Sequence, residues 1–238
     1  KLRHRIGLIL DFSKASGWRS EGAPRQSLSA LLSKQQEGGN FPSMPYEELP
    51  AFIAKVKGKT ETMGRLALLF TILTAARNGE VRDAMWSQFD LDNGLWHRPA
   101  SMMRKNGDAH TITLSPEALE VLDRVKLWRT VEADCRVFPG KGGKRLSDMT
   151  IGKEMAALPY VVHGFRSTFR TWAAERMPSV PEAVAEAALA HRIPDAVVRS
   201  YNRAKFLEMR RTLLDAWGRY ASGTSGDVVQ LPLGLRQG

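Results

Sequence analysis

The sequence predicts a mainly α-helical fold with a small antiparallel β-sheet, an α+β arrangement. Apolar residues recur at helical spacing through most of the chain after residue 45, whereas the alternation typical of strands is confined to residues 89–114. Turn residues divide that stretch into short pieces, as expected for a small sheet at one edge of a helical domain. Of the 238 residues, 43% are hydrophobic, which is enough to bury an ordinary core.

The first 45 residues differ in composition from the rest. Four apolar residues recur there at helical spacing: Leu2, Ile6, Ile9 and Leu10. The helix that they predict is expected to end near Gly17. Residues 20–45 are rich in Ser, Gly, Gln and Pro and predict a linker. The segment 1–19 is therefore a single helix, too short to fold alone.

A helix and two turns are expected around the sheet. Four apolar residues at spacings of three and four indicate the helix: Leu66, Leu69, Phe70 and Leu73. Residues 89–99 predict a hairpin in which Asn93-Gly94 forms a type I′ turn. A second turn at 105–108 leads into a strand at 110–114.

Helices dominate the remainder of the chain. Ser115 followed by Pro116 predicts a helix start, because Ser caps helices and Pro suits their first position. The expected helices cover about 116–128, 147–156, 164–177, 181–190, 195–201 and 204–220.

Charge and cysteine content narrow the function classes. The net charge of +10 favours a polyanionic partner, most simply nucleic acid, although a generic basic protein is an alternative. The single cysteine, Cys135, excludes an internal disulfide framework, and no histidine pair has metal-ligand spacing, so we expect neither metal nor cofactor. Without a signal peptide or an apolar run of about 18 residues, a cytoplasmic protein is expected. The chain starts at Lys1 and not at Met, so we expect it to be a fragment.

The candidate site is an ordered series of cations, imidazoles and one phenol. Its members are Arg77, Lys105, His163, Arg166, His191 and Tyr201. Cations can hold a phosphate and a phenol can attack it, so the series contains the groups for phosphoryl transfer without a metal.

This ordered series resembles the tyrosine recombinase family, specifically phage and genomic-island integrases, from roughly residue 45 to 221. The resemblance implies the tyrosine recombinase catalytic-domain fold over residues 46–221. Residues 1–19 would then be the C-terminal helix of a core-binding domain, 20–45 the linker, and 222–238 a C-terminal tail.

The resemblance also implies a role for each member of the series. Tyr201 would be the nucleophile, and Arg77 and Arg166 would clamp the phosphate through their planar guanidinium groups. His163 would accept or relay the tyrosine proton, and His191 would donate a hydrogen bond to a phosphate oxygen. For each of these residues alone, a structural role is the ordinary alternative.

Two further residues have less certain roles. Lys105 would be the general acid for the leaving 5′-oxygen, with an exposed turn lysine as the alternative and Arg104 beside it as a rival. Glu80 would orient Arg77 or His163, and a simple helix ion pair is the alternative. His110 follows Lys105 at a spacing common in the family, but no chemistry is assigned to it.

The resemblance implies a site-specific recombinase that integrates or excises a mobile element through a 3′-phosphotyrosyl intermediate. Its partners would be double-stranded DNA, three further copies in a tetramer on that DNA, and an accessory DNA-bending or directionality factor. Free in solution the chain would be a monomer. It would be encoded by a bacterium or a phage. A type IB topoisomerase and a non-catalytic DNA-binding regulator on the same scaffold are the alternatives.

Overall fold

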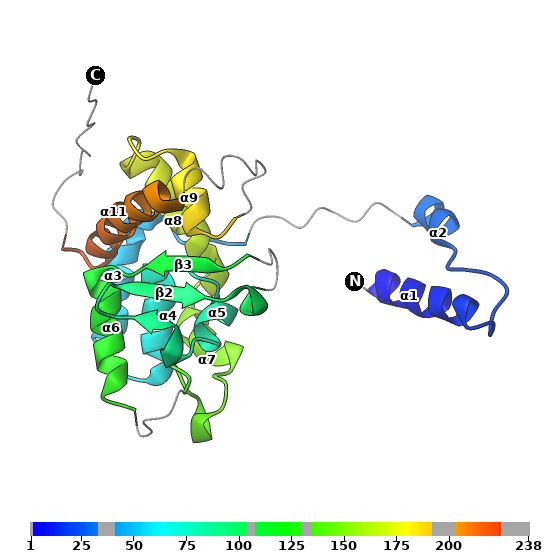
Figure 1. The fold of residues 1–238 in the computed structure, drawn as a ribbon, viewed down its shortest axis with the longest axis horizontal. Coiled ribbons are helices and arrows are strands. Elements are labelled where there is room, and N and C mark those ends of the chain that lie inside the picture. Colours follow the sequence, from blue (N-terminus) through cyan, green and yellow to red (C-terminus); the bar gives the residue numbers. More distant parts are fainter. Residues whose placement is uncertain (1, 33–40, 104–107, 130–134, 192–202, 225–238) are drawn as a thin grey trace. The chain divides into compact units, whose positions relative to one another are not determined.

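The structure is a computed structural model that describes residues 2–32, 41–103, 108–129, 135–191 and 203–224 (Figure 1). The chain divides into two units, Lys1–Asn40 and Phe41–Gly238. The expected helix 195–201 and most of the expected tail lie outside the described residues.

The first unit contains two helices, α1 (Leu2–Ala15) and α2 (Arg25–Leu31). The chain leaves α1 through Gly17, whose φ of +75° suits glycine, so the predicted helix end is confirmed. Asp11 joins the two helices, because its carboxylate accepts from the backbone N–H of Ala23 at 2.9 Å and pairs with Arg25. Helix α2 lies within the segment predicted to be a linker. It buries no residue, and the Ser, Gly, Gln and Pro content around it favoured the linker prediction.

The second unit contains the remaining helices and the sheet. The helices are α3 (Leu49–Lys57), α4 (Met63–Thr74), α5 (Asn78–Arg82), α6 (Pro116–Lys126), α7 (Asp148–Gly152), α8 (Phe165–Arg176), α9 (Glu182–Ala188) and α11 (Arg203–Ala221). The helices predicted at 116–128, 164–177, 181–190 and 204–220 are confirmed to within a few residues. The helix predicted at 147–156 is α7 followed by a 3-10 turn, Lys153–Met155.

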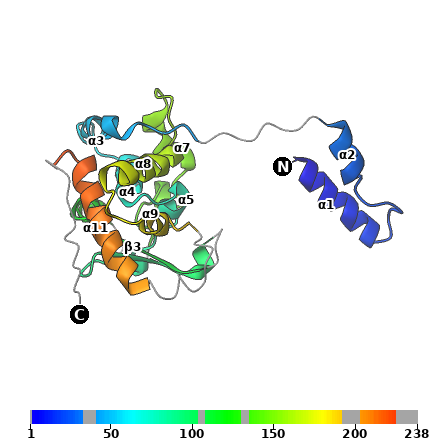
Figure 2. The same ribbon diagram turned by 90° about the horizontal axis from the view of Figure 1, so that it is seen from above.

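Helix α4 runs through the centre of this unit. Every residue from Leu66 to Thr74 is buried, so the helix is enclosed on all sides and not only along the predicted apolar face. Helix α11 packs against α3, α4, α8 and α9 (Figure 2). Trp217 of α11 is fully buried and donates its indole N–H to the carbonyl of Ile72 at 2.8 Å. This contact anchors α11 to the central helix.

The sheet confirms the predicted fold class. Strands β1 (Phe89–Asp90), β2 (Leu95–Arg98) and β3 (His110–Thr113) are antiparallel in the order β1-β2-β3. Arg98 pairs with His110 at the end of β2.

The hairpin between β1 and β2 is confirmed, but its predicted type I′ turn is wrong. Asp90 pairs with Leu95, so the loop has four residues, and of its Asn93-Gly94 pair only Gly94 has a positive φ. The Asp90 carboxylate accepts from both the backbone and the side-chain amide of Asn93, at 3.1 and 2.8 Å. These bonds favour the longer loop over a two-residue turn.

The predicted cap of α6 is confirmed and is open to test. The buried Ser115 hydroxyl accepts from the backbone N–H of Ala118, so Ser115→Ala is expected to cost about 1 kcal/mol of unfolding free energy. Ser147, at the same position of α7, makes no such bond, and Ser147→Ala is the matched control, with an expected cost below about 0.5 kcal/mol. Urea denaturation measures both, and equal costs would contradict the capping role.

Candidate functional site

Arg77 lies at the corner between α4 and α5, just after Ala75, a non-glycine residue with a φ of +49°. Its guanidinium bonds the Glu80 carboxylate at 3.0 Å, and its backbone N–H bonds the other carboxylate oxygen at 3.1 Å. Only 21% of the Arg77 side chain is exposed. Glu80 therefore fixes both the backbone and the side chain of Arg77.

A second arginine, Arg98, which the sequence analysis did not select, contacts the same carboxylate. Its guanidinium lies 3.0 Å from Glu80 and 5.4 Å from the centre of the Trp96 ring, and the residue is 3% exposed. Burial alone would raise the pKa of Glu80, but Arg98 and Arg77 outweigh it and lower that pKa. Strand alternation was the available signal, because Arg98 shares a sheet face with the buried Trp96.

Arg166, in the first turn of α8, connects two helix ends. One terminal nitrogen donates to the carbonyl of Ala75 at 2.6 Å, and the other donates to the carbonyl of Leu189 at 2.5 Å. The residue after Leu189, Ala190, has a φ of +50°, so both helix ends turn through the left-handed region. Burial and the nearby Arg77 lower the pKa of Arg166 to about 10, which leaves the group cationic at neutral pH.

His191 follows α9 and faces Arg166. Its Nε2 lies 3.1 Å from a terminal nitrogen of Arg166, and its Nδ1 lies 2.6 Å from a carboxylate oxygen of Glu186. Arg170 of α8 donates to the other oxygen of Glu186 at 2.5 Å. The structure thus brings Arg77, Arg166 and His191 together, as the sequence analysis expected.

His163 lies on the 3-10 turn Val162–Gly164 that leads into α8, and it is exposed. The ring of Phe41 packs edge-on against it, with 4.7 Å between ring centres. A side chain at Gly164 would overlap the carbonyl oxygen of Pro42, so only glycine fits there. The segment that begins at Phe41 therefore lies directly on the turn that carries His163.

His110 of β3 also reaches this region. Burial and the cation of Arg210 lower its pKa to about 4, and its ring bonds the backbone of Ala188 in α9. The ring is neutral at pH 7, and its Nε2 has no partner among the described residues. No chemistry was predicted for His110, and its contacts make it a link between the sheet and α9.

Lys105 and Tyr201 lie outside the described residues. The other three tyrosines all have raised pKa values. A hydrogen bond to Glu175 raises the pKa of Tyr46, and burial, with Glu48 nearby, raises that of Tyr160. Tyr220 is affected mainly by burial, and its hydroxyl donates to the carbonyl of Tyr46 at 3.2 Å. Deprotonation, which a nucleophile needs, is disfavoured at all three positions.

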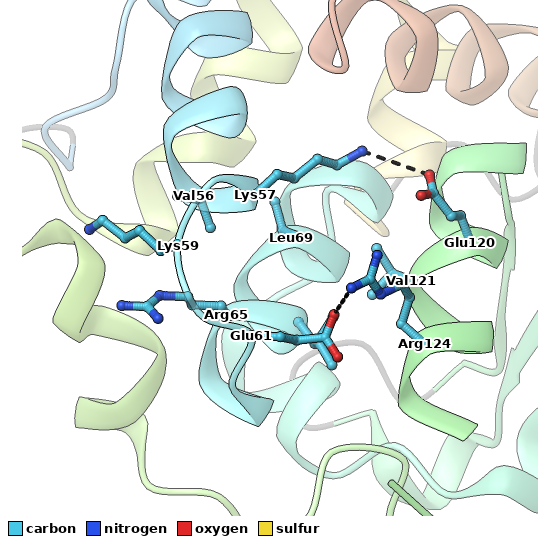
Figure 3. Close-up of a pocket in the computed structure, with 10 residues that line it drawn as sticks. Val56, Lys57, Lys59, Glu61, Arg65, Leu69, Glu120, Val121 and Arg124 are labelled. Carbon is cyan, nitrogen blue, oxygen red and sulfur yellow. Dashed lines mark ion pairs between the residues drawn. The ribbon is translucent and has the colours of Figure 1, made fainter. Parts of the chain in front are cut away.

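A surface pocket lies near the opposite end of α4 (Figure 3). Its cations are already paired with carboxylates: Lys57 with Glu120 at 3.7 Å, and Arg124 with Glu61 at 2.5 Å. Lys59 and Arg65 both pair with Glu154, and cations that are already paired attract a phosphate less strongly. The candidate site is therefore the cation cluster at the other end of the helix.

The described part of the chain contains neither a cluster of metal ligands nor a membrane-spanning helix. No group of three or more His, Cys, Asp or Glu side chains is placed to hold a metal ion. No helix among those residues is long and apolar enough to cross a bilayer.

Comparison with known proteins gives the family to which this fold belongs. The sequence model of the phage integrase family matches residues 42–208, and the chain belongs to this family. It is 30% identical over 219 residues to prophage integrase IntZ of Escherichia coli K12, covering 90% of this chain and 53% of that protein. Over 237 residues it is 29% identical to prophage integrase IntA of the same strain, covering 96% and 56%. The chain thus spans about half the length of the curated relatives it matches.

Solved structures show the same fold. A lambda integrase (75–356) dimer bound to a COC′ core site matches with a TM-score of 0.56 and 16% identity, covering 80% of this chain and 70% of that one. The integrase from mycobacterium phage Brujita matches with a TM-score of 0.57 and 10% identity, covering 94% and 76%.

Proposed function

We propose that this chain is the catalytic part of a site-specific DNA recombinase, an integrase that cleaves and rejoins DNA. The observation that carries the proposal is the meeting of Arg77, Arg166 and His191 where α4 and α9 end and α5 and α8 begin, with Glu80 and Glu186 behind them. Three cationic or hydrogen-bonding groups held from behind are preorganised for a charged phosphate. The amino end of α8 adds its helix dipole to the same place.

The proposed reaction begins when the Tyr201 oxygen attacks the scissile phosphate. The P–O5′ bond breaks, a 3′-phosphotyrosyl link forms, and Lys105 delivers a proton to the leaving 5′-oxygen. Arg77 and Arg166 stabilise the charge on the non-bridging oxygens, and His163 accepts or relays the tyrosine proton. Because a phenolate is a good leaving group, a 5′-hydroxyl of another strand reverses the reaction without metal or nucleotide.

The proposed partner is double-stranded DNA, which the net charge of +10 favours. A solved lambda integrase tetramer bound to a Holliday junction matches this chain with a TM-score of 0.57, which supports a tetramer on DNA. Residues 46–221 would be the catalytic domain, 1–19 the end of a core-binding domain, 20–45 the connection and 222–238 the tail. We also propose an accessory DNA-bending or directionality factor as a partner. The protein would be bacterial or phage-encoded and would act in the cytoplasm.

A nicked suicide substrate tests this function. Duplex DNA carrying the junctions of the element that encodes the chain is labelled at either end of the cleaved strand. We expect a protein–DNA adduct that retains the 5′ label, a free 5′-hydroxyl on the other fragment, and no effect of EDTA. No adduct on any junction would contradict the proposal, and relaxation of supercoils without strand exchange would indicate a topoisomerase instead.

Lys105→Ala is expected to slow cleavage of normal DNA about 10²- to 10⁴-fold, the usual size of general-acid catalysis. A bridging 5′-thiol leaving group needs no proton, so on that substrate the same variant should cleave at close to the wild-type rate. Arg104→Ala is the matched control and should behave like wild type on both substrates. Equal losses on both substrates would remove the general-acid role from Lys105.

A further inference from the structure

The imidazole of His191 contacts oppositely charged groups on its two nitrogens. Glu186 lies 2.6 Å from Nδ1, and Arg166 lies 3.1 Å from Nε2. A carboxylate only accepts hydrogen bonds and a guanidinium only donates them. The proton of the neutral ring is therefore on Nδ1, and Nε2 presents its lone pair to Arg166.

Glu186 is itself held in place. Arg170 donates to its other oxygen, and the backbone N–H of His191 bonds the Glu186 carbonyl at 3.0 Å. The left-handed φ of Ala190 turns the chain back so that the imidazole meets the helix it has just left. Burial alone would raise the pKa of Glu186, but the hydrogen bonds from Arg170 and His191 outweigh it and lower that pKa, so the group is an anion at neutral pH.

The charged and titratable groups around His191 come from α9, α8, the corner between α4 and α5, and β3. Glu186 belongs to α9, Arg166 and Arg170 to α8, and Arg77 and Glu80 to the corner between α4 and α5, where they act on Arg166. From β3, His110 contacts the backbone of α9 and is neutral. Among these groups, Glu186 is the anion in direct contact with the imidazole.

In its DNA-free state, His191 cannot donate a hydrogen bond from Nε2, because that nitrogen accepts from Arg166. A phosphate oxygen between the two side chains would take over the Arg166 donor. Nε2 would then need a proton from solvent in order to donate to the phosphate, and the ring would become an imidazolium. A neighbouring carboxylate favours that charged form.

We propose that Glu186 is the positioning residue of His191. It keeps the proton on Nδ1, directs Nε2 toward Arg166, and stabilises the imidazolium that donates to the phosphate. This inference rests on the proposed recombinase function and extends it to a residue that acts through His191. Arg170 supports the same arrangement by fixing the carboxylate.

The chain offers a matched pair of variants. Glu182 also pairs with Arg170, but it is exposed and has no recorded contact with His191, so Glu182→Gln removes the same charge without touching the imidazole. We expect Glu186→Gln to slow adduct formation on the suicide substrate about 10- to 100-fold, as for other residues that orient a functional histidine. Glu182→Gln should retain the wild-type rate.

The pH profile separates positioning from a structural effect. An imidazolium is lost as pH rises, and removing the adjacent anion makes it less stable. The alkaline limb of the cleavage profile should therefore move to lower pH in Glu186→Gln and stay in place in Glu182→Gln. Equal rates and profiles for the two variants would overturn the proposal.

A second measurement needs neither DNA nor a variant. Nitrogen-15 NMR of labelled histidine in the DNA-free protein should show neutral His191 protonated on Nδ1, and protonation on Nε2 would overturn the proposal even if Glu186→Gln failed to fold. The proposed function can fail separately: a wild-type chain that forms no adduct contradicts the recombinase, whereas an active wild type with no difference between the two variants contradicts only the role of Glu186.

Discussion

Tyr201→Phe is expected to abolish the covalent protein–DNA adduct and leave DNA affinity nearly unchanged. Phenylalanine keeps the aromatic ring, and only the attacking oxygen is lost. Adduct formation is measured on the suicide substrate by denaturing gel electrophoresis, and affinity by gel shift at fixed salt concentration. We expect no detectable adduct and a dissociation constant within about threefold of wild type, a difference below about 1 kcal/mol.

Tyr220→Phe is the control for this experiment. Its hydroxyl donates to the Tyr46 carbonyl, and its ring lies 6.3 Å from that of Trp217, so it belongs to the packing around α11. The variant should lose about 1 kcal/mol of unfolding free energy for the missing hydrogen bond and keep the ability to form an adduct. Loss of the adduct in Tyr220→Phe and its persistence in Tyr201→Phe would exchange the roles of the two residues.

Arg166→Lys is expected to affect both catalysis and stability. Lysine keeps the charge, but it cannot reproduce a planar group that bonds two carbonyls and faces a phosphate at the same time. Loss of one preorganised donor should slow adduct formation about 10²- to 10³-fold. Breaking one charged hydrogen bond, to Ala75 or Leu189, should also lower the unfolding free energy by about 1.5–3 kcal/mol.

Arg176→Lys, at the exposed end of the same helix, is the control and should change neither quantity measurably. Single-turnover rates of adduct formation and urea denaturation, measured on the same preparations, separate the two effects. A variant that is destabilised but cleaves at the wild-type rate would show that Arg166 only joins the helix ends. A variant that is stable but inactive would leave the phosphate clamp as its only role.

The order of residue types along the chain was enough to predict three of the groups that form the site. The series from Arg77 through Arg166 to His191 indicated a phosphate site, and the structure brings these three side chains together. The main helices and the sheet followed from periodicity and from turn and capping residues, as the Ser115 cap illustrates. The type I′ turn failed because the Asp90 carboxylate stabilised a different loop.

The residues behind the site could not be predicted in the same way. Arg98 reaches Glu80 only because β2 lies beside the corner after α4, and a charged residue within a strand is ordinarily an exposed one. Glu186 meets His191 because Ala190 adopts a left-handed conformation that alanine rarely adopts. Strand alternation indicates that Arg98 is buried on the same face as Trp96, but the partners of Arg98 and of Glu186 depend on the final packing.

We propose that Tyr201 attacks DNA from a site organised by Arg77, Arg166 and His191. Mapping the residue that is covalently linked to DNA tests this directly. The wild-type adduct is trapped on the suicide substrate and digested with trypsin and nuclease, and the modified peptide is sequenced by mass spectrometry. We expect a nucleotide phosphate on the peptide that begins at Ser200, with the modification on Tyr201. A modification on Tyr46, Tyr160 or Tyr220, or on a residue other than tyrosine, would contradict it.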